Sequence, residues 1–210
     1  MSNGYTRLAN RARTSLIFNT IGWRASCKLW VKAMQKVLML GLLAALAPLP
    51  GSTLQQLSLD NMIRLSTAIV HGKTQQSVSS YRGSIIYTHY QVQVSETFKG
   101  TAASHLDMVV PGGAANQWQQ TFAGAPTLTP GQDYVLFLWT SKSGLTQIIG
   151  LSQGLFVVTT NASGQTIVTR AASTERMVNA AGQQVNDSNM QMPLSDLRSR
   201  IQTILGGGGK

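Results

Sequence analysis

Cysteine is almost missing from this chain of 210 residues, since Cys27 is the only one. It precedes the apolar run Val37–Leu49, so the chain after that run has no cysteine at all. Disulfides, a thiol nucleophile and a cysteine metal cluster are therefore excluded there. A domain without such cross-links must be stabilised by its hydrophobic core, and the chain is long enough to bury one.

Acidic residues are missing from the first part of the chain, where Asp60 is the first of seven. The formal net charge of +10 is therefore uneven, because seven of the 17 basic residues lie ahead of residue 37. The remaining ten face all seven acids, which leaves that part close to neutral. This distribution argues against nucleic acid as a partner.

Long hydrophobic runs are limited to Val37–Leu49, which is shorter than the roughly 20 residues of a membrane-spanning helix. A basic flank, an apolar run and then small residues are typical of a signal peptide. We expect residues 1–53 to be this leader, with cleavage between Ala47 and Thr53 and a secreted or periplasmic product. Two alternatives stay open: translation from Met34, and an uncleaved leader that is the only membrane contact.

Catalytic motifs are also scarce. No phosphate-binding glycine loop occurs, and no cofactor is expected. The three histidines, His71, His89 and His105, fall on successive predicted strands, where Glu96 or Asp107 could complete a metal site. Their spacing lacks the clustering of metal ligands, which favours surface histidines.

One segment, Gly150–Gly154, does match the G-x-S-x-G pattern of a hydrolase with Ser152 as nucleophile. That mechanism needs a helix after the serine, whereas Leu155–Thr160 has the composition of a strand. We therefore predict no enzyme activity, with a serine hydrolase using Ser152 or a histidine metal module as the alternatives.

Short β-branched segments separated by glycine turns dominate the rest of the chain. Ile85–Gly100 alternates apolar and polar side chains, and Tyr134–Thr140 is apolar on both faces, as expected for a central strand. The sequence predicts a mainly β fold, a small OB-like antiparallel β-barrel with a short N-terminal helix and a C-terminal helix. The predicted parts are a barrel domain (54–170), a polar linker (171–191), a helix (192–205) and a glycine-rich tail (206–210).

Five motifs occur in order along residues 57–160: LSLDNMIRLSTAIVHG, YQVQVSETFKG, DMVVPGG, PGQDYVLFLW and IIGLSQGLFVV. In this the chain resembles a group of uncharacterised exported bacterial β-domains. More remotely, it is similar to the OB-type barrel of tissue inhibitors of metalloproteinases and netrin modules. Those inhibitors act through an amino-terminal cysteine, which the exported part lacks, so the resemblance implies a fold and not an activity.

The segment Ala114–Thr129 is predicted to be a long loop, and loops of that length are often functional. Together with the polar face of Ile85–Gly100 it offers Tyr87, Trp118 and Phe122 as aromatic anchors. We therefore expect a non-enzymatic binding module whose partner is a protein or a component of the cell envelope.

Overall fold

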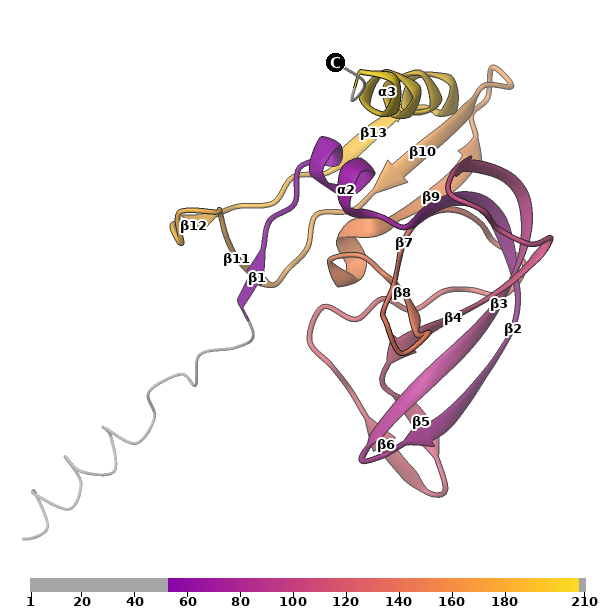
Figure 1. The fold of residues 1–210 in the computed structure, drawn as a ribbon, viewed down its shortest axis with the longest axis vertical. Coiled ribbons are helices and arrows are strands. Elements are labelled where there is room, and N and C mark those ends of the chain that lie inside the picture. The colour runs from indigo at the N-terminus through magenta and orange to yellow at the C-terminus, as the bar shows by residue number, and fades with distance from the viewer. Residues whose placement is uncertain (1–52, 208–210) are drawn as a thin grey trace, which may run out of the picture. The chain divides into compact units, whose positions relative to one another are not determined.

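The computed structural model of this protein describes residues 53–207, which form a mainly β fold with two α-helices (Figure 1). The predicted leader lies outside the described residues except for Thr53, and so do the last three residues of the tail. The helices are α2 (Leu59–Leu65), α3 (Leu194–Gly206) and the short 3-10 helix η1 (Leu151–Gly154). The strands are β1 (Thr53–Gln55), β2 (Ala68–Arg82), β3 (Ile85–Lys99), β4 (His105–Pro111), β5 (Gly113–Ala115), β6 (Trp118–Gln120), β7 (Asp133–Thr140), β8 (Thr146–Ile148), β9 (Leu155–Thr160), β10 (Thr166–Arg170), β11 (Arg176–Val178), β12 (Gln184–Val185) and β13 (Met190–Pro193).

Eight of the strands form one large sheet in the order β13-β10-β9-β7-β2-β3-β4-β8, and β7 pairs with β8 as well. Its pairings are antiparallel except for β4 with β8, where Val109 faces Gln147 in a parallel bridge. Two smaller sheets, β1-β11-β12 and β5-β6, lie beside it. The long strands β2 and β3 run together as a curved pair, with the β5–β6 hairpin near one end (Figure 1).

The alternation predicted for Ile85–Gly100 is confirmed in β3. Ile86, Tyr90 and Val92 are buried, while Gln91 and Gln93 are exposed. One face of the strand therefore packs in the core and the other meets solvent.

Strand β7 is central, as predicted, because both of its faces are buried. Tyr134, Leu136 and Leu138 join one apolar cluster with side chains of β2, β3 and β4. Val135 and Phe137 join a second cluster on the opposite face, with side chains of both helices. The sheet thus separates two cores, and β7 contributes to each.

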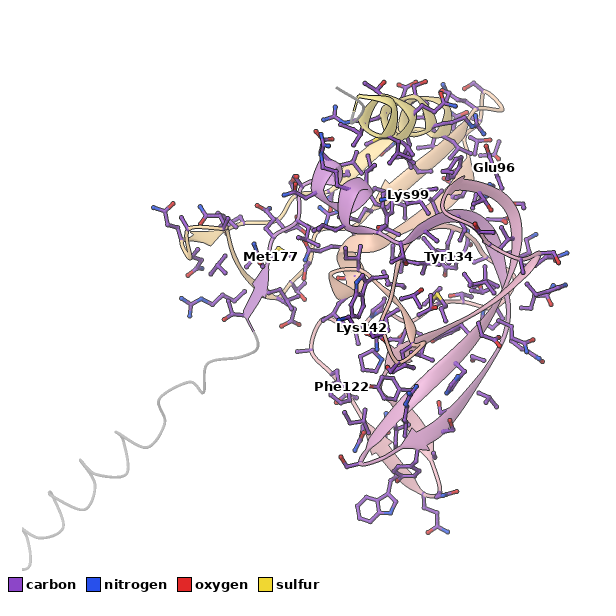
Figure 2. All side chains as sticks on the ribbon, in the orientation of Figure 1. Glu96, Lys99, Phe122, Tyr134, Lys142 and Met177 are labelled. Atoms are coloured by element: carbon purple, nitrogen blue, oxygen red, sulfur yellow. The ribbon has the colours of Figure 1, made fainter. Side chains whose placement is uncertain are left out.

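Helix α2 is held at both ends by specific polar contacts. The backbone N–H of Asn61 donates to Ser58 Oγ at 3.2 Å, which makes Ser58 the N-cap. At the other end Lys99 Nζ donates to the carbonyl oxygens of Ile63 (2.7 Å) and Arg64 (2.8 Å). An ammonium group suits the negative end of a helix. Burial lowers the pKa of Lys99. Figure 2 shows Lys99 beside α2.

Helix α3 is fastened over the second core by two arginines. Arg198 donates to both oxygens of Glu96, at 2.9 and 2.8 Å, and its guanidinium lies 5.7 Å from the Phe98 ring centre. Arg200 makes an equivalent pair with Asp60 of α2. Glu96 interrupts the apolar face of β3, and its carboxylate holds this helix through Arg198.

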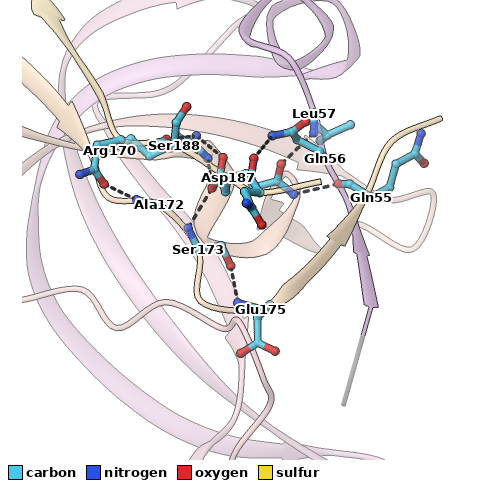
Figure 3. A network of polar contacts seen from close by, with 12 residues as sticks. Gln55, Gln56, Leu57, Arg170, Ala172, Ser173, Glu175, Asp187 and Ser188 are labelled. Carbon is cyan, nitrogen blue, oxygen red and sulfur yellow. Dashed lines mark hydrogen bonds and ion pairs between the residues drawn. The ribbon is translucent and has the colours of Figure 1, made fainter. Parts of the chain in front are cut away.

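The segment 171–191 differs from the polar linker that its composition predicted, since it contains β11, β12 and the start of β13. Its anchor is an ion pair between Arg170 and Asp187, each with only 2% of its side chain exposed (Figure 3). Both Asp187 oxygens accept from Arg170, at 2.8 and 3.0 Å, and Oδ2 also accepts from the Ser173 backbone N–H at 2.8 Å. In a flexible linker these charged side chains would be solvated. Here Asp187 and Ser173 instead take part in a buried hydrogen-bond network with Arg170.

Candidate functional site

The predicted loop Ala114–Thr129 begins instead with a β-hairpin. Its strands β5 and β6 are joined by Asn116 and Gln117, whose φ angles are 48° and 68°. Positive φ at both central residues is the geometry of the tight turn that matches the twist of paired strands. The sequence did not predict this turn, because Asn-Gln lacks the glycine that usually marks a two-residue hairpin turn.

The hairpin is fixed to the start of β3 by Gln120. Its Oε1 accepts from the Ile86 N–H at 2.7 Å, and its Nε2 donates to the Ser84 carbonyl at 2.9 Å. The Gly112 N–H adds a bond to the Ile86 carbonyl at 2.8 Å. The side-chain amide of Gln120 therefore makes hydrogen bonds that the backbone of a neighbouring strand would otherwise make, and these bonds hold the hairpin in one position.

Gly113 lets the hairpin approach the β2–β3 pair closely. Its φ is +132°, and a Cβ atom there would collide with both Ser79 Oγ and Thr88 Oγ1. Only glycine fits a position with that conformation and that contact.

Two aromatic side chains stand out from this anchored element. Trp118 on β6 is 71% exposed and Phe122, just after β6, is 40% exposed. We call Trp118 and Phe122 the hairpin surface. In Figure 2, Phe122 lies well away from Glu96 and Lys99, which adjoin the helices.

A pocket of about 270 Å³ adjoins Phe122. Thr88 and Tyr90 of β3, Gln119 and Gln120 of the hairpin, and the segment Ala125–Thr127 line it. None of the described residues around this pocket is charged. Its chemistry therefore suits an uncharged partner that offers hydrogen bonds.

The rest of the loop is held against the sheet. The Leu128 N–H donates to Tyr90 Oη at 3.4 Å and the Thr129 N–H to Tyr134 Oη at 2.9 Å. The Thr74 hydroxyl donates to the Thr129 carbonyl at 2.6 Å. Buried tyrosine hydroxyls thus satisfy the loop backbone, and Leu128 fills the core beneath it.

Tyr87 does not join the hairpin surface. Thr88 lines the pocket beside Phe122, and successive side chains of a strand point to opposite faces. Tyr87 therefore lies on the other face of β3, beside Ser80 of β2. The sequence placed these aromatics together because it could not reveal which face the hairpin covers.

The three histidines are spread along the sheet. His71 pairs with Glu96, His89 with Val78, and His105 with Gln93. Glu96 lies seven positions after His89 along β3, which is roughly 23 Å at about 3.3 Å per residue. Residues 53–207 contain no group of three His, Cys, Asp or Glu side chains that could hold a metal ion.

Ser152 lies in η1, which leads directly into strand β9. Its neighbour Gln153 is 1% exposed, accepts from the Leu57 N–H at 2.8 Å and donates to the Gln55 carbonyl at 3.0 Å. A Cβ atom on Gly154 would lie 2.8 Å from the Ile149 carbonyl oxygen. The GLSQG motif therefore has a structural explanation: through Gln153 it holds the end of β1 and Leu57, which follows it, beside η1.

Comparison of the chain with protein-family models, with curated proteins and with solved structures gave no match. Among residues 53–207, no helix is long and apolar enough to cross a membrane.

Proposed function

We propose that this protein is an exported binding module built on an OB-type barrel. The barrel is supported by the pairing of β2, β3, β4, β8 and β7 in succession, after which β7 pairs again with β2. Five mostly antiparallel strands that return to the first are typical of the OB fold. Export is supported by the basic and apolar leader in the sequence.

The hairpin surface is the binding site in this proposal, and the partner is a protein or a component of the cell envelope. The observation that carries it is the exposure of Trp118 on a hairpin held by Gln120 and Gly113. Tryptophan is enriched among the residues that dominate binding energy. An anchor that is already ordered loses little conformational entropy on binding.

The module acts without catalysis or a cofactor. Gln153 and Gly154 account for the hydrolase-like motif through packing and hydrogen bonds, so no observation favours Ser152 as a nucleophile. The uncharged pocket beside Phe122 favours recognition by stacking and hydrogen bonds over ion pairing.

Capture experiments with the full chain as bait test this proposal, using the envelope fraction of the producing cell. Trp118→Ala should abolish capture of the partner and leave the melting curve unchanged, because the indole is mostly in solvent. Trp139→Ala is the matched control, since Trp139 is 45% exposed and lines a different groove with Leu54 and Leu57. Undiminished capture by Trp118→Ala would refute the assignment.

A further inference from the structure

Strand β2 has one unpaired edge in its second half. It pairs with β7 only from Ala68 to Lys73, while its pairing with β3 continues to Arg82. A bulge at Gln75 and Gln76 marks the change. From there to Arg82, β2 has β3 on one side and, among the residues that the structure describes, no strand on the other. We call residues 75–82 the β2 edge.

The backbone groups that face outward follow from the pairing register. Gly83 and Ser84 form a two-residue turn, so Arg82 and Ile85 make a hydrogen-bonded pair, and such pairs alternate with non-hydrogen-bonded ones. The N–H and C=O groups of Ser77, Ser79 and Tyr81 therefore point away from β3. Among the described residues, no backbone hydrogen bond from a turn, loop or helix cap involves these N–H and C=O groups.

The β2 edge also lacks the usual protection against strand pairing. Natural edges are covered, shortened, or carry proline or charge. The stretch from Gln75 to Tyr81 has no charge, no proline and no glycine. It exposes Val78, at 68%, and most of its other side chains. An edge of this kind is a template for another strand.

We propose that the β2 edge pairs with the same edge of a second copy of this chain, antiparallel, with the two-fold axis at Ser79. Two identical edges related by a two-fold axis must run antiparallel. In this register Ser77 faces Tyr81 of the second copy, so the outward N–H and C=O groups of each edge meet those of the other. Ser77, Ser79 and Tyr81 are the residues whose backbone groups point outward, and only a two-fold axis at Ser79 is centred on this set.

Charge and side-chain position agree with this register. Arg82 faces Gln76 of the second copy, so the two arginines are kept apart. Val78 faces Ser80 of the second copy on the side of the sheet that carries Tyr87. The face with the β5–β6 hairpin is the opposite one, so the hairpin surface is not consumed by the pairing.

We expect the dimer to be reversible, because an edge of eight residues offers a small interface and interfaces below roughly 1,200 Å² are typical of transient complexes. It therefore forms at high protein concentration and dissociates on dilution.

Cysteine cross-linking of the full chain tests the register, in a Cys27→Ser background that has no other thiol. Val78 and Ser80 of the second copy form a non-hydrogen-bonded pair, whose Cα atoms lie about 4.5 Å apart, within disulfide range. Mixing differently tagged Val78→Cys and Ser80→Cys chains under mild oxidation should give several-fold more mixed dimer than either homodimer. Val78→Cys mixed with Ala180→Cys, in the exposed turn before β12, measures random collision.

Sedimentation velocity supplies a second measurement that needs no cysteine. Ser80→Lys places a charge at the interface and should weaken association at least tenfold. Thr97→Lys adds the same charge to the same face of β3, beside Val70 and outside the β2 edge, and should not. A mixed dimer no more abundant than the collision control would overturn the proposal. The β2 edge would then be available for a strand of another protein instead. A wild-type chain that stays monomeric at millimolar concentration would also overturn it.

Discussion

Removal of Asp187 is the sharpest test of the fold, because the sequence alone would predict almost no effect. Asp187→Ala removes two hydrogen bonds from Arg170 and the backbone hydrogen bonds from Ser173 and Ser188. Arg170, whose side chain is 2% exposed in the wild-type protein, would keep only its bond to the Ser188 carbonyl, at 2.9 Å. Leaving one partner of a buried pair uncompensated costs about 3–5 kcal/mol. That is a large part of the roughly 5–15 kcal/mol of a typical domain.

Urea unfolding followed by circular dichroism measures this loss as a lower midpoint at unchanged slope. Asp60→Ala is the matched control, since it breaks a similar arginine pair at the surface and should leave the midpoint near that of wild type. Replacing both partners, Arg170→Met with Asp187→Leu, should recover much of the loss, because no buried charge is then left unpaired. A loss below about 1 kcal/mol for Asp187→Ala would show that the ion pair with Arg170 does not anchor residues 171–191.

The same pair predicts a dependence on pH. Burial opposes ionisation of Asp187, but hydrogen bonds from Arg170, Ser173 and Ser188 outweigh it, so its pKa lies below the ordinary 3.8. Its contribution is therefore complete above about pH 4 and is lost as the pH falls through the lowered pKa. Wild type should lose more stability than Asp187→Asn on acidification below pH 4. Parallel acid titrations of the two proteins would contradict this.

Two further substitutions test the motifs on which the resemblance rested. Lys99→Met should destabilise the domain by about 1–2 kcal/mol, because it leaves two carbonyl oxygens of α2 without their hydrogen-bond donor. Thermal melting measures this loss. An unchanged melting temperature would show that Lys99 does not stabilise the end of α2. Gly154→Ala should cost about 1–3 kcal/mol, since the new methyl group meets the Ile149 carbonyl and must displace backbone. Gly206→Ala is the control, because Gly206 in α3 also has no positive φ and a methyl group there meets nothing within 4 Å. It should not destabilise the domain, and equal losses for the two variants would exclude the steric explanation.

The sequence predicted the elements whose side-chain pattern is local. Alternation along β3 identified a strand with one buried and one solvent-facing side, and the apolar run of β7 identified a central strand. The C-terminal helix, predicted at 192–205, corresponds to α3, whose buried residues Leu194, Leu197 and Ile201 repeat at helical spacing. In each case the residues that decide the structure lie within one turn or one strand.

Features that depend on distant partners could not be predicted. Asp187 looks like a solvated residue until β10 brings Arg170 to it, and Gln120 looks like a loop residue until it meets Ile86. The separation of Tyr87 from Phe122 likewise depends on the side of the sheet that the hairpin crosses. Composition alone therefore does not identify polar residues whose buried partners are distant in the sequence.

The two proposed surfaces lie on different parts of the sheet, and this makes them separable by experiment. The hairpin surface is carried by β6, on the face of β3 that bears Thr88, whereas Val78 lies with Tyr87 on the opposite face. Pairing through the β2 edge would leave both copies of Trp118 free, and a dimer would present two binding sites and gain avidity for a repetitive partner. Trp118→Ala should therefore leave the cross-linking of Val78→Cys with Ser80→Cys unchanged, while Ser80→Lys should weaken capture only on a surface where the partner is dense. If Trp118→Ala instead abolished cross-linking, one continuous surface would serve both contacts, and the placement of the two-fold axis at Ser79 would be wrong.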